Sequence, residues 1–187
     1  MHLLKSYFKY MCAPEETLQI FLEQRSFGQA CIGYFTAALS WVLFFNIASG
    51  VPFPLFLLKL GLVFAAELTV GFVWAAFCGL LLDLLRVETS SAKLFSLIGS
   101  SGFIKGLLIA FALISAALPA SQLGVLAPFA GFLVLVLQLG YLVRSLKRIY
   151  GVSYTKALYV WVFALVPVLV AVVLLGVFLV WGITLLF

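Results

Sequence analysis

The chain has 187 residues, of which 66% are hydrophobic and only 9% are charged, and its net charge is +5. Soluble domains carry about 25% charged residues, and a water-soluble core of this size cannot bury so much apolar surface. The composition therefore excludes an ordinary soluble domain and predicts an all-α, polytopic membrane helix bundle. Because the cations lie in short stretches beside apolar runs, we interpret them as determinants of topology and expect no nucleic-acid surface.

Residues 1–27 precede the first long apolar run and are predicted to form amphipathic cytoplasmic helices. Within residues 1–12, apolar side chains recur at helical spacing while Lys5 and Lys9 lie toward the other side, as in a helix that rests on a membrane surface. Pro14 suits the first turn of a second helix. Two roles stay open for this segment, namely packing beneath the bundle and binding a partner.

Residues 28–187 are expected to form a transmembrane domain of five helices, since about 20 apolar residues cross the hydrocarbon of a bilayer. Pro52 and Pro54 should separate the first two spans, and Pro167 should kink the last. The serine- and glycine-containing stretch before Phe103 is interpreted as an interfacial lead-in to a short third span. The predicted spans are 28–48, 55–85, 103–118, 123–143 and 157–187.

The distribution of cations predicts the orientation of these five spans. The predicted loops of one side contain nearly all the lysines and arginines, whereas the loops near Pro52 and Pro119 are uncharged. The positive-inside rule therefore places the N-terminus in the cytoplasm and the C-terminus outside. The linker between the fourth and fifth spans supplies a predicted cytoplasmic basic cluster, formed by Arg144, Lys147, Arg148 and Lys156.

Glu67 is the clearest candidate for a functional residue because it lies about 12 residues into the second span. A charge at the centre of a membrane helix costs roughly 2.5–3.5 kcal/mol, so it needs a partner or a role. At about 100° per residue, Gly71, Trp74 and Cys78 share its helix face. The functional interpretation is a proton or cation site. The structural one, which we prefer, is a neutral or paired glutamate that holds a neighbouring helix.

Asp83 and Lys105 are two further charged intramembrane candidates. Asp83 lies near the cytoplasmic end of the second span and points away from the face of Glu67, where it should reach Arg86 one turn later. Lys105 lies near the start of the predicted third span, as Lys59 does in the second, and each is expected to extend its ammonium group to the membrane interface. Snorkelling of this kind suffices to explain the two lysines.

Asn46 and Gln138 are the uncharged polar candidates. Gln138 falls on one stripe of the fourth span with Gly124 and Gly131, which predicts a close helix contact closed by a side-chain hydrogen bond. No catalytic, metal or cofactor site is predicted, because His2 is the only histidine, the three cysteines form no C-x-x-C pair, and no phosphate-binding loop occurs.

Three segments resemble the YIP (Ypt-interacting protein) family of five-span membrane proteins, in its compact bacterial form. They are APEETLQIFLEQ, SSAKLFSLIGSSGFIKGLL and LKRIYGVSYTKAL. The resemblance implies five spans, a cytoplasmic N-terminus, an external C-terminus and a bacterial inner membrane. Eukaryotic relatives are associated with Rab GTPases and vesicle traffic, but this sequence lacks their long cytosolic N-terminal region and their D-L-Y-G-P type motif.

Two functions from different classes remain open at this point. The first is a non-enzymatic scaffold or membrane-organising protein of trafficking type that acts through its cytoplasmic face. The alternative is a small ion or solute channel or transporter in which Glu67 lines a polar path with Asn46 or Gln138. The expected partners are membrane lipids, with other membrane or cytoplasmic proteins and a second copy of the chain left open.

Overall fold

A computed structural model describes residues 27–46, 51–117 and 120–186, with side chains placed at 27–46, 51–116, 128–171, 173 and 174. The described residues are almost entirely helical, as predicted. The helices expected within residues 1–27 lie outside the described part, apart from Phe27, which begins the first described helix. The helices are α3 (Phe27–Asn46), α4 (Phe53–Leu84), α5 (Ser91–Lys105), α6 (Leu107–Ala117), α7 (Ala120–Tyr150) and α8 (Tyr154–Leu186).

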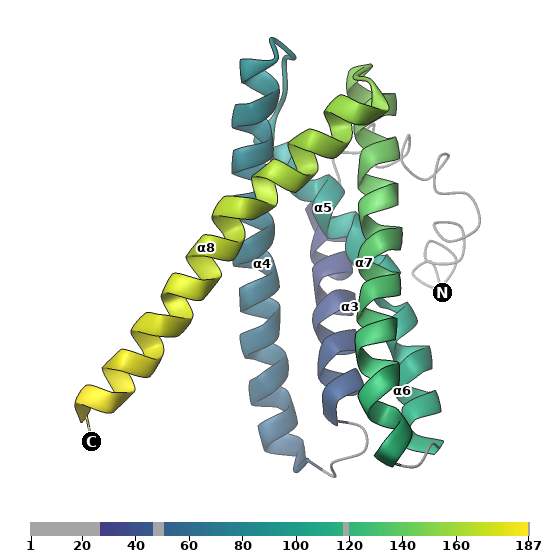
Figure 1. Ribbon diagram of the computed structural model, residues 1–187, viewed down its shortest axis with the longest axis vertical. Coiled ribbons are helices and arrows are strands. Elements are labelled where there is room, and N and C mark those ends of the chain that lie inside the picture. The colour runs from purple at the N-terminus through teal and green to yellow at the C-terminus, as the bar shows by residue number, and fades with distance from the viewer. Residues whose placement is uncertain (1–26, 47–50, 118–119, 187) are drawn as a thin grey trace.

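Five helical segments of the described chain are long and apolar enough to cross a membrane, in agreement with the predicted number. They are Phe27–Asn46, Phe53–Leu84, Ser91–Ala116, Pro128–Tyr150 and Tyr154–Ala171. Figure 1 shows them as one elongated bundle. The turns from α4 to α5 and from α7 to α8 lie at one end, whereas α3 and α6 end at the other.

The third of these segments differs most from the sequence prediction, because its helix begins at Ser91 rather than at Phe103. The supposed lead-in is a buried helix, α5, in which Leu94, Ile98 and Ser101 are almost completely inaccessible. A break follows at Gly106, where the Gly106 N–H donates to the Phe103 carbonyl at 3.0 Å. The chain then continues as α6, so that α5 and α6 together make one span-length unit.

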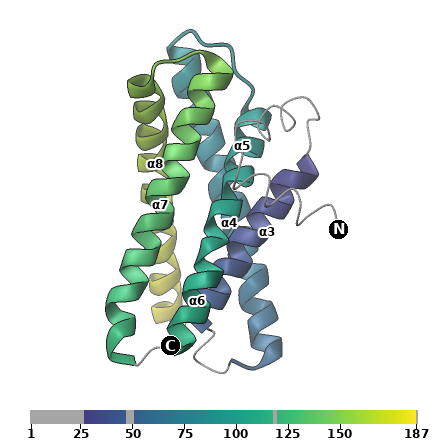
Figure 2. The same ribbon diagram turned by 90° about the vertical axis from the view of Figure 1, so that its right-hand side faces the viewer.

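Close contact between α3 and α5 explains why small residues of low hydropathy are found in a buried helix. A Cβ atom on Gly33 of α3 would collide with the carbonyl oxygen of Gly99 on α5, and one on Gly102 would collide with the carbonyl of Gly33. Tyr34 adds a hydrogen bond from its hydroxyl to the Phe95 carbonyl, at 3.0 Å. Only residues without a side chain allow this approach, in which α3 runs obliquely across α5 and α6 (Figure 2).

The turn between α4 and α5 corrects the prediction that Asp83 pairs with Arg86. Arg86 has a left-handed backbone (φ 59°) directly after the helix. Its N–H donates to the Asp83 carbonyl at 2.9 Å, and the Val87 N–H donates to that of Leu82 at 3.0 Å, as in a Schellman motif. The Asp83 carboxylate instead accepts a 3.4 Å hydrogen bond from the Thr89 hydroxyl. The local chain reversal, rather than the charges, decides where these side chains lie.

The turn between α7 and α8 has a related construction. Gly151 supplies the left-handed residue (φ 65°) and donates its N–H to the Lys147 carbonyl at 2.9 Å. The hydroxyl of Ser153 then accepts a 3.4 Å hydrogen bond from the Lys156 N–H in the first turn of α8. This pattern accounts for the most distinctive part of LKRIYGVSYTKAL as a helix-ending and helix-starting sequence.

Helix α8 crosses the front of the bundle in Figure 1 and packs against α4 and α7. Trp161 is fully buried and meets Trp74 of α4 edge to face, with ring centroids 5.2 Å apart. The Trp74 indole N–H donates to the Trp161 carbonyl at 3.2 Å. The opposite face carries exposed apolar side chains such as Phe163. Pro167 lies within α8 without ending it.

Candidate functional site

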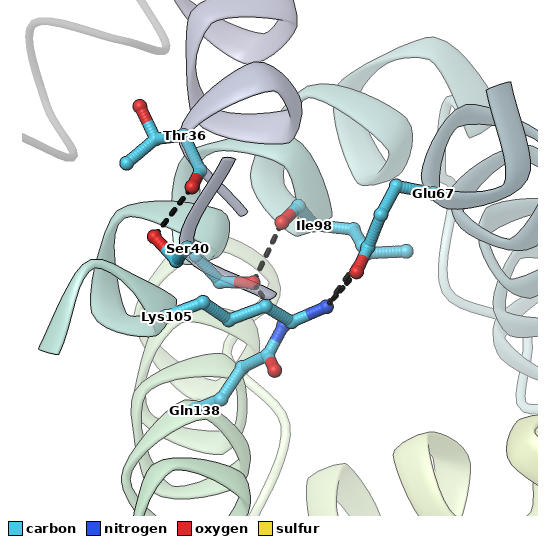
Figure 3. A network of polar contacts seen from close by, with 7 residues as sticks. Thr36, Ser40, Glu67, Ile98, Lys105 and Gln138 are labelled. Atoms are coloured by element: carbon cyan, nitrogen blue, oxygen red, sulfur yellow. Dashed lines mark hydrogen bonds and ion pairs between the residues drawn. The ribbon is translucent and has the colours of Figure 1, made fainter. Parts of the chain in front are cut away.

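An ion pair between Glu67 of α4 and Lys105 of α5 lies in the middle part of the bundle. The Lys105 ammonium nitrogen is 2.7 Å and 2.8 Å from the two carboxylate oxygens, and each side chain is 15% exposed. Figure 3 shows the two side chains reaching toward each other from separate helices. Lys105 is the last residue of α5, where the negative end of the helix dipole also favours a cation. The pair joins α4 to α5 and neutralises both charges.

This geometry corrects the prediction for Lys105. The sequence predicts that Lys105 lies near the start of a span, with its ammonium group at the membrane interface. Because the helical segment begins at Ser91 and ends at Ala116, Lys105 lies well inside it and pairs with Glu67. Opposite charges within a membrane span are expected to pair in this way. The preferred interpretation of Glu67, a residue that is paired and holds a neighbouring helix, matches the observed contact.

A cavity of about 290 Å³ adjoins the ion pair and is bounded by α3, α4, α5, α7 and α8. Glu67, Gly71 and Trp74 all line it, as their predicted shared helix face requires, whereas Cys78, which was predicted on the same face, is buried but does not line the cavity. Most of the remaining wall is apolar or aromatic and includes Tyr34 and Trp41. The cavity therefore combines a polar region at the ion pair with a larger apolar surface.

Gln138 of α7 forms a second polar contact at the same cavity. Its side-chain nitrogen donates a 2.8 Å hydrogen bond to the hydroxyl of Ser101 on α5, and that hydroxyl donates to the Ile98 carbonyl at 2.6 Å (Figure 3). The predicted hydrogen bond from Gln138 to another helix is thus confirmed. The predicted close contact at Gly131 is wrong, because a Cβ atom there would meet nothing within 4 Å. Gly131 instead lines the cavity, and the side chain of Gly124 lies outside the described residues.

Asn46 does not join this site. It is the last residue of α3, where its side-chain nitrogen donates to the Val42 carbonyl at 2.8 Å and its oxygen accepts a 2.6 Å hydrogen bond from Lys59. It is not among the residues that line the cavity beside Glu67. Among the described residues, Glu67 and Gln138 therefore line the same cavity, whereas Asn46 does not.

The end of the bundle at which α4 and α7 terminate carries a set of exposed cations. We call this end of the bundle the basic end. Two acidic residues, Asp83 and Glu88, are also exposed there. Lys147 lies over the ring of Tyr154, 3.8 Å from its centroid. The cations come from both turns and from the adjacent helix ends: Arg86, Lys93, Arg144, Lys147, Arg148 and Lys156. The predicted cluster of four cations is thus extended by two from the neighbouring turn.

No group of three or more His, Cys, Asp or Glu side chains that could hold a metal ion occurs among the described residues. Comparison of the chain with protein-family models, with curated proteins and with solved structures gave no match. The fold and the two sites described above therefore carry the functional argument.

Proposed function

We propose that the chain is a non-enzymatic scaffold or membrane-organising protein that acts through the basic end, in the manner suggested by its resemblance to compact bacterial YIP proteins. In this proposal the five apolar helices cross the bacterial inner membrane, with the N-terminus in the cytoplasm and the C-terminus outside. The observation that carries the proposal is the gathering of six exposed cations around two turns at one end of the bundle.

The charge distribution supports both the orientation and the recruitment of anionic lipids. Among the described residues, only Lys59 and Lys105 are cations outside the basic end, and both have hydrogen-bond partners on another helix. Each exposed cation near an anionic membrane surface contributes about 1 kcal/mol of attraction. The simpler alternative is that these cations only determine topology. That alternative predicts no preference for anionic lipids once the protein is inserted.

Lipid selectivity in reconstituted membranes distinguishes these explanations. We expect spin-labelled phosphatidylglycerol to associate with the parent protein several-fold more strongly than spin-labelled phosphatidylcholine, and salt to weaken the difference. A triple variant, Arg144→Gln with Lys147→Gln and Arg148→Gln, should lose most of the preference, whereas Lys59→Gln should keep it. An equal preference in the triple variant and the parent would contradict recruitment by these cations. Capture of a cytoplasmic protein that the triple substitution leaves undiminished would contradict it too.

The topology is tested separately by tags on the two termini. An odd number of crossings requires the two tags to lie on opposite sides of the membrane, and the proposed orientation requires the N-terminal tag to be protected and the C-terminal tag to be accessible from the periplasm of intact cells. Labelling of both tags from the same side would rule out five crossings, whatever the lipid experiment gives.

A small channel or solute transporter is the second candidate, and the cavity beside Glu67 is the observation that favours it. The ion pair limits this candidate, because a cation bound by Glu67 would have to displace Lys105 from a contact of 2.7 Å. Flux measurements in proteoliposomes test it directly. Ion or proton movement that requires Glu67 should fall in Glu67→Gln, and unchanged movement in that variant, or none in the parent, would remove the candidate.

A further inference from the structure

The cavity beside the Glu67–Lys105 ion pair has a hydrogen-bonding group in its wall. Gln138 is only 8% exposed and lines the cavity, and its side-chain nitrogen is engaged by Ser101. Among the described residues, the hydrogen bond of the Gln138 side chain is made by its nitrogen, and its amide oxygen is not one of the fully buried atoms that lack a partner. Because Gln138 lines the cavity, this oxygen is the group of the residue that can accept a hydrogen bond from a molecule bound there.

The charges of the site restrict what that molecule can be. Glu67 and Lys105 neutralise each other at 2.7 Å, so the cavity has no net charge to offer. A ligand with a net charge would leave one unbalanced charge within an apolar bundle, which is unfavourable. An uncharged ligand can instead donate to the Gln138 oxygen and accept from Lys105 without separating the pair.

The walls of the cavity provide the complementary apolar surface. Trp41 and Trp74 contribute two aromatic side chains, and Leu135, which is 58% exposed, is part of the lining at the outer surface of α7. The cavity therefore reaches the surface of the bundle that would face the hydrocarbon if the helices cross a bilayer. A molecule that arrives by this route must dissolve in lipid, which also favours an uncharged one.

We infer that this cavity binds a small uncharged molecule that has a hydroxyl or amide group on an apolar ring or short chain. Its volume of about 290 Å³ lies just below the roughly 300–1,000 Å³ found for ligand pockets, so the ligand has about one ring. The inference relies on the five helices being membrane-embedded. It is independent of the scaffold role of the basic end.

The test uses 4-bromobenzyl alcohol as the probe and the intrinsic fluorescence of the full-length protein in lipid nanodiscs. Bromine quenches indoles only at short range, and Trp41 and Trp74 both line the cavity. Binding should appear as saturable quenching on top of the linear quenching caused by probe dissolved in the lipid. Linear quenching alone in the parent would overturn the inference.

Two glycines of α7 provide matched variants. A Cβ atom would meet nothing within 4 Å at Gly131, which lines the cavity, or at Gly140, which does not line it. Gly131→Phe should fill the cavity and weaken the saturable quenching at least tenfold, while Gly140→Phe should leave it unchanged. Circular dichroism establishes that both variants are folded. Equal saturable quenching in the two variants would place the probe elsewhere and overturn the inference.

The polar part of the inference has its own test, which does not depend on a glycine variant. Gln138→Leu should weaken binding of 4-bromobenzyl alcohol about three- to tenfold but leave binding of 4-bromotoluene unchanged, because only the alcohol donates a hydrogen bond. The parent should bind 4-bromobenzoate and 4-bromobenzylamine more weakly than the alcohol. Tighter binding of either charged probe, or of zwitterionic 4-bromophenylalanine, would contradict an uncharged ligand class.

Discussion

Replacement of Lys105 by glutamine tests the ion pair that joins α4 to α5. The substitution removes the only described partner of the Glu67 carboxylate and leaves that charge in a site where its side chain is 15% exposed. Removing one member of a buried ion pair typically costs about 3–5 kcal/mol. Placing an unpaired charge at the centre of a membrane helix costs roughly 2.5–3.5 kcal/mol. Both comparisons predict a large loss of stability.

The cavity reduces the expected loss toward the lower end of these ranges. At about 30 Å³ per water molecule, its volume of about 290 Å³ has room for several waters near the stranded carboxylate. We therefore expect Lys105→Gln to lower the free energy of unfolding by about 3 kcal/mol, which is more than a hundredfold in the equilibrium constant. The double variant Glu67→Gln with Lys105→Gln leaves no buried charge and should lie within about 1 kcal/mol of the parent.

Unfolding by sodium dodecyl sulfate in mild detergent, followed by thiol labelling, measures these differences. Cys78 of α4 is fully buried and becomes reactive only when the bundle opens, so it serves as the reporter after Cys12 and Cys31 are replaced by serine. Lys59→Gln is the control, because it removes a lysine that donates one hydrogen bond near a helix end and should cost about 1 kcal/mol.

Two results would refute the reasoning about the ion pair. Equal losses in Lys105→Gln and Lys59→Gln would mean that the pair adds nothing beyond an ordinary hydrogen bond. A double variant as unstable as Lys105→Gln would mean that the lost lysine side chain, rather than the stranded glutamate, causes the effect. Recovery in the double variant is the outcome specific to a charge left without its partner.

Three further predictions concern the backbone, and the same unfolding assay measures each. Gly33→Ala should lower the free energy of unfolding by about 2–3 kcal/mol, because the added Cβ atom would collide with the backbone of α5. Gly28→Ala is the control and should not lower it, because the space there is open, and equal effects of the two substitutions would refute the close contact. Arg86→Gly should raise the free energy of unfolding by about 1 kcal/mol, because glycine adopts the left-handed backbone of this position without strain, and no increase would contradict that strain. Gly151→Ala should lower the free energy of unfolding by about 1 kcal/mol, because alanine is strained in the left-handed backbone of this position, and an unchanged free energy would contradict that strain.

The all-helical fold class and one half of the candidate site can be predicted from composition and periodicity. Apolar content and segment length are sums over neighbouring residues, so they predict five helices without knowledge of how these pack. The helical period placed Gly71 and Trp74 on the face of Glu67, where the cavity lies. The cost of a charge within a span also indicated that Glu67 needs a partner. These conclusions depend only on local periodicity and on composition.

The packing of the helices, by contrast, establishes which residue pairs with Glu67 and where the third span begins. Low hydropathy made the stretch before Phe103 resemble an interfacial segment, yet its glycines and Gly33 allow α3 to approach it so closely that Ser100 and Ser101 are buried. The longer helix then places Lys105 deep enough to meet Glu67. Which helix faces meet depends on backbone approach between segments distant in sequence, and neither hydropathy nor period within one segment contains that information.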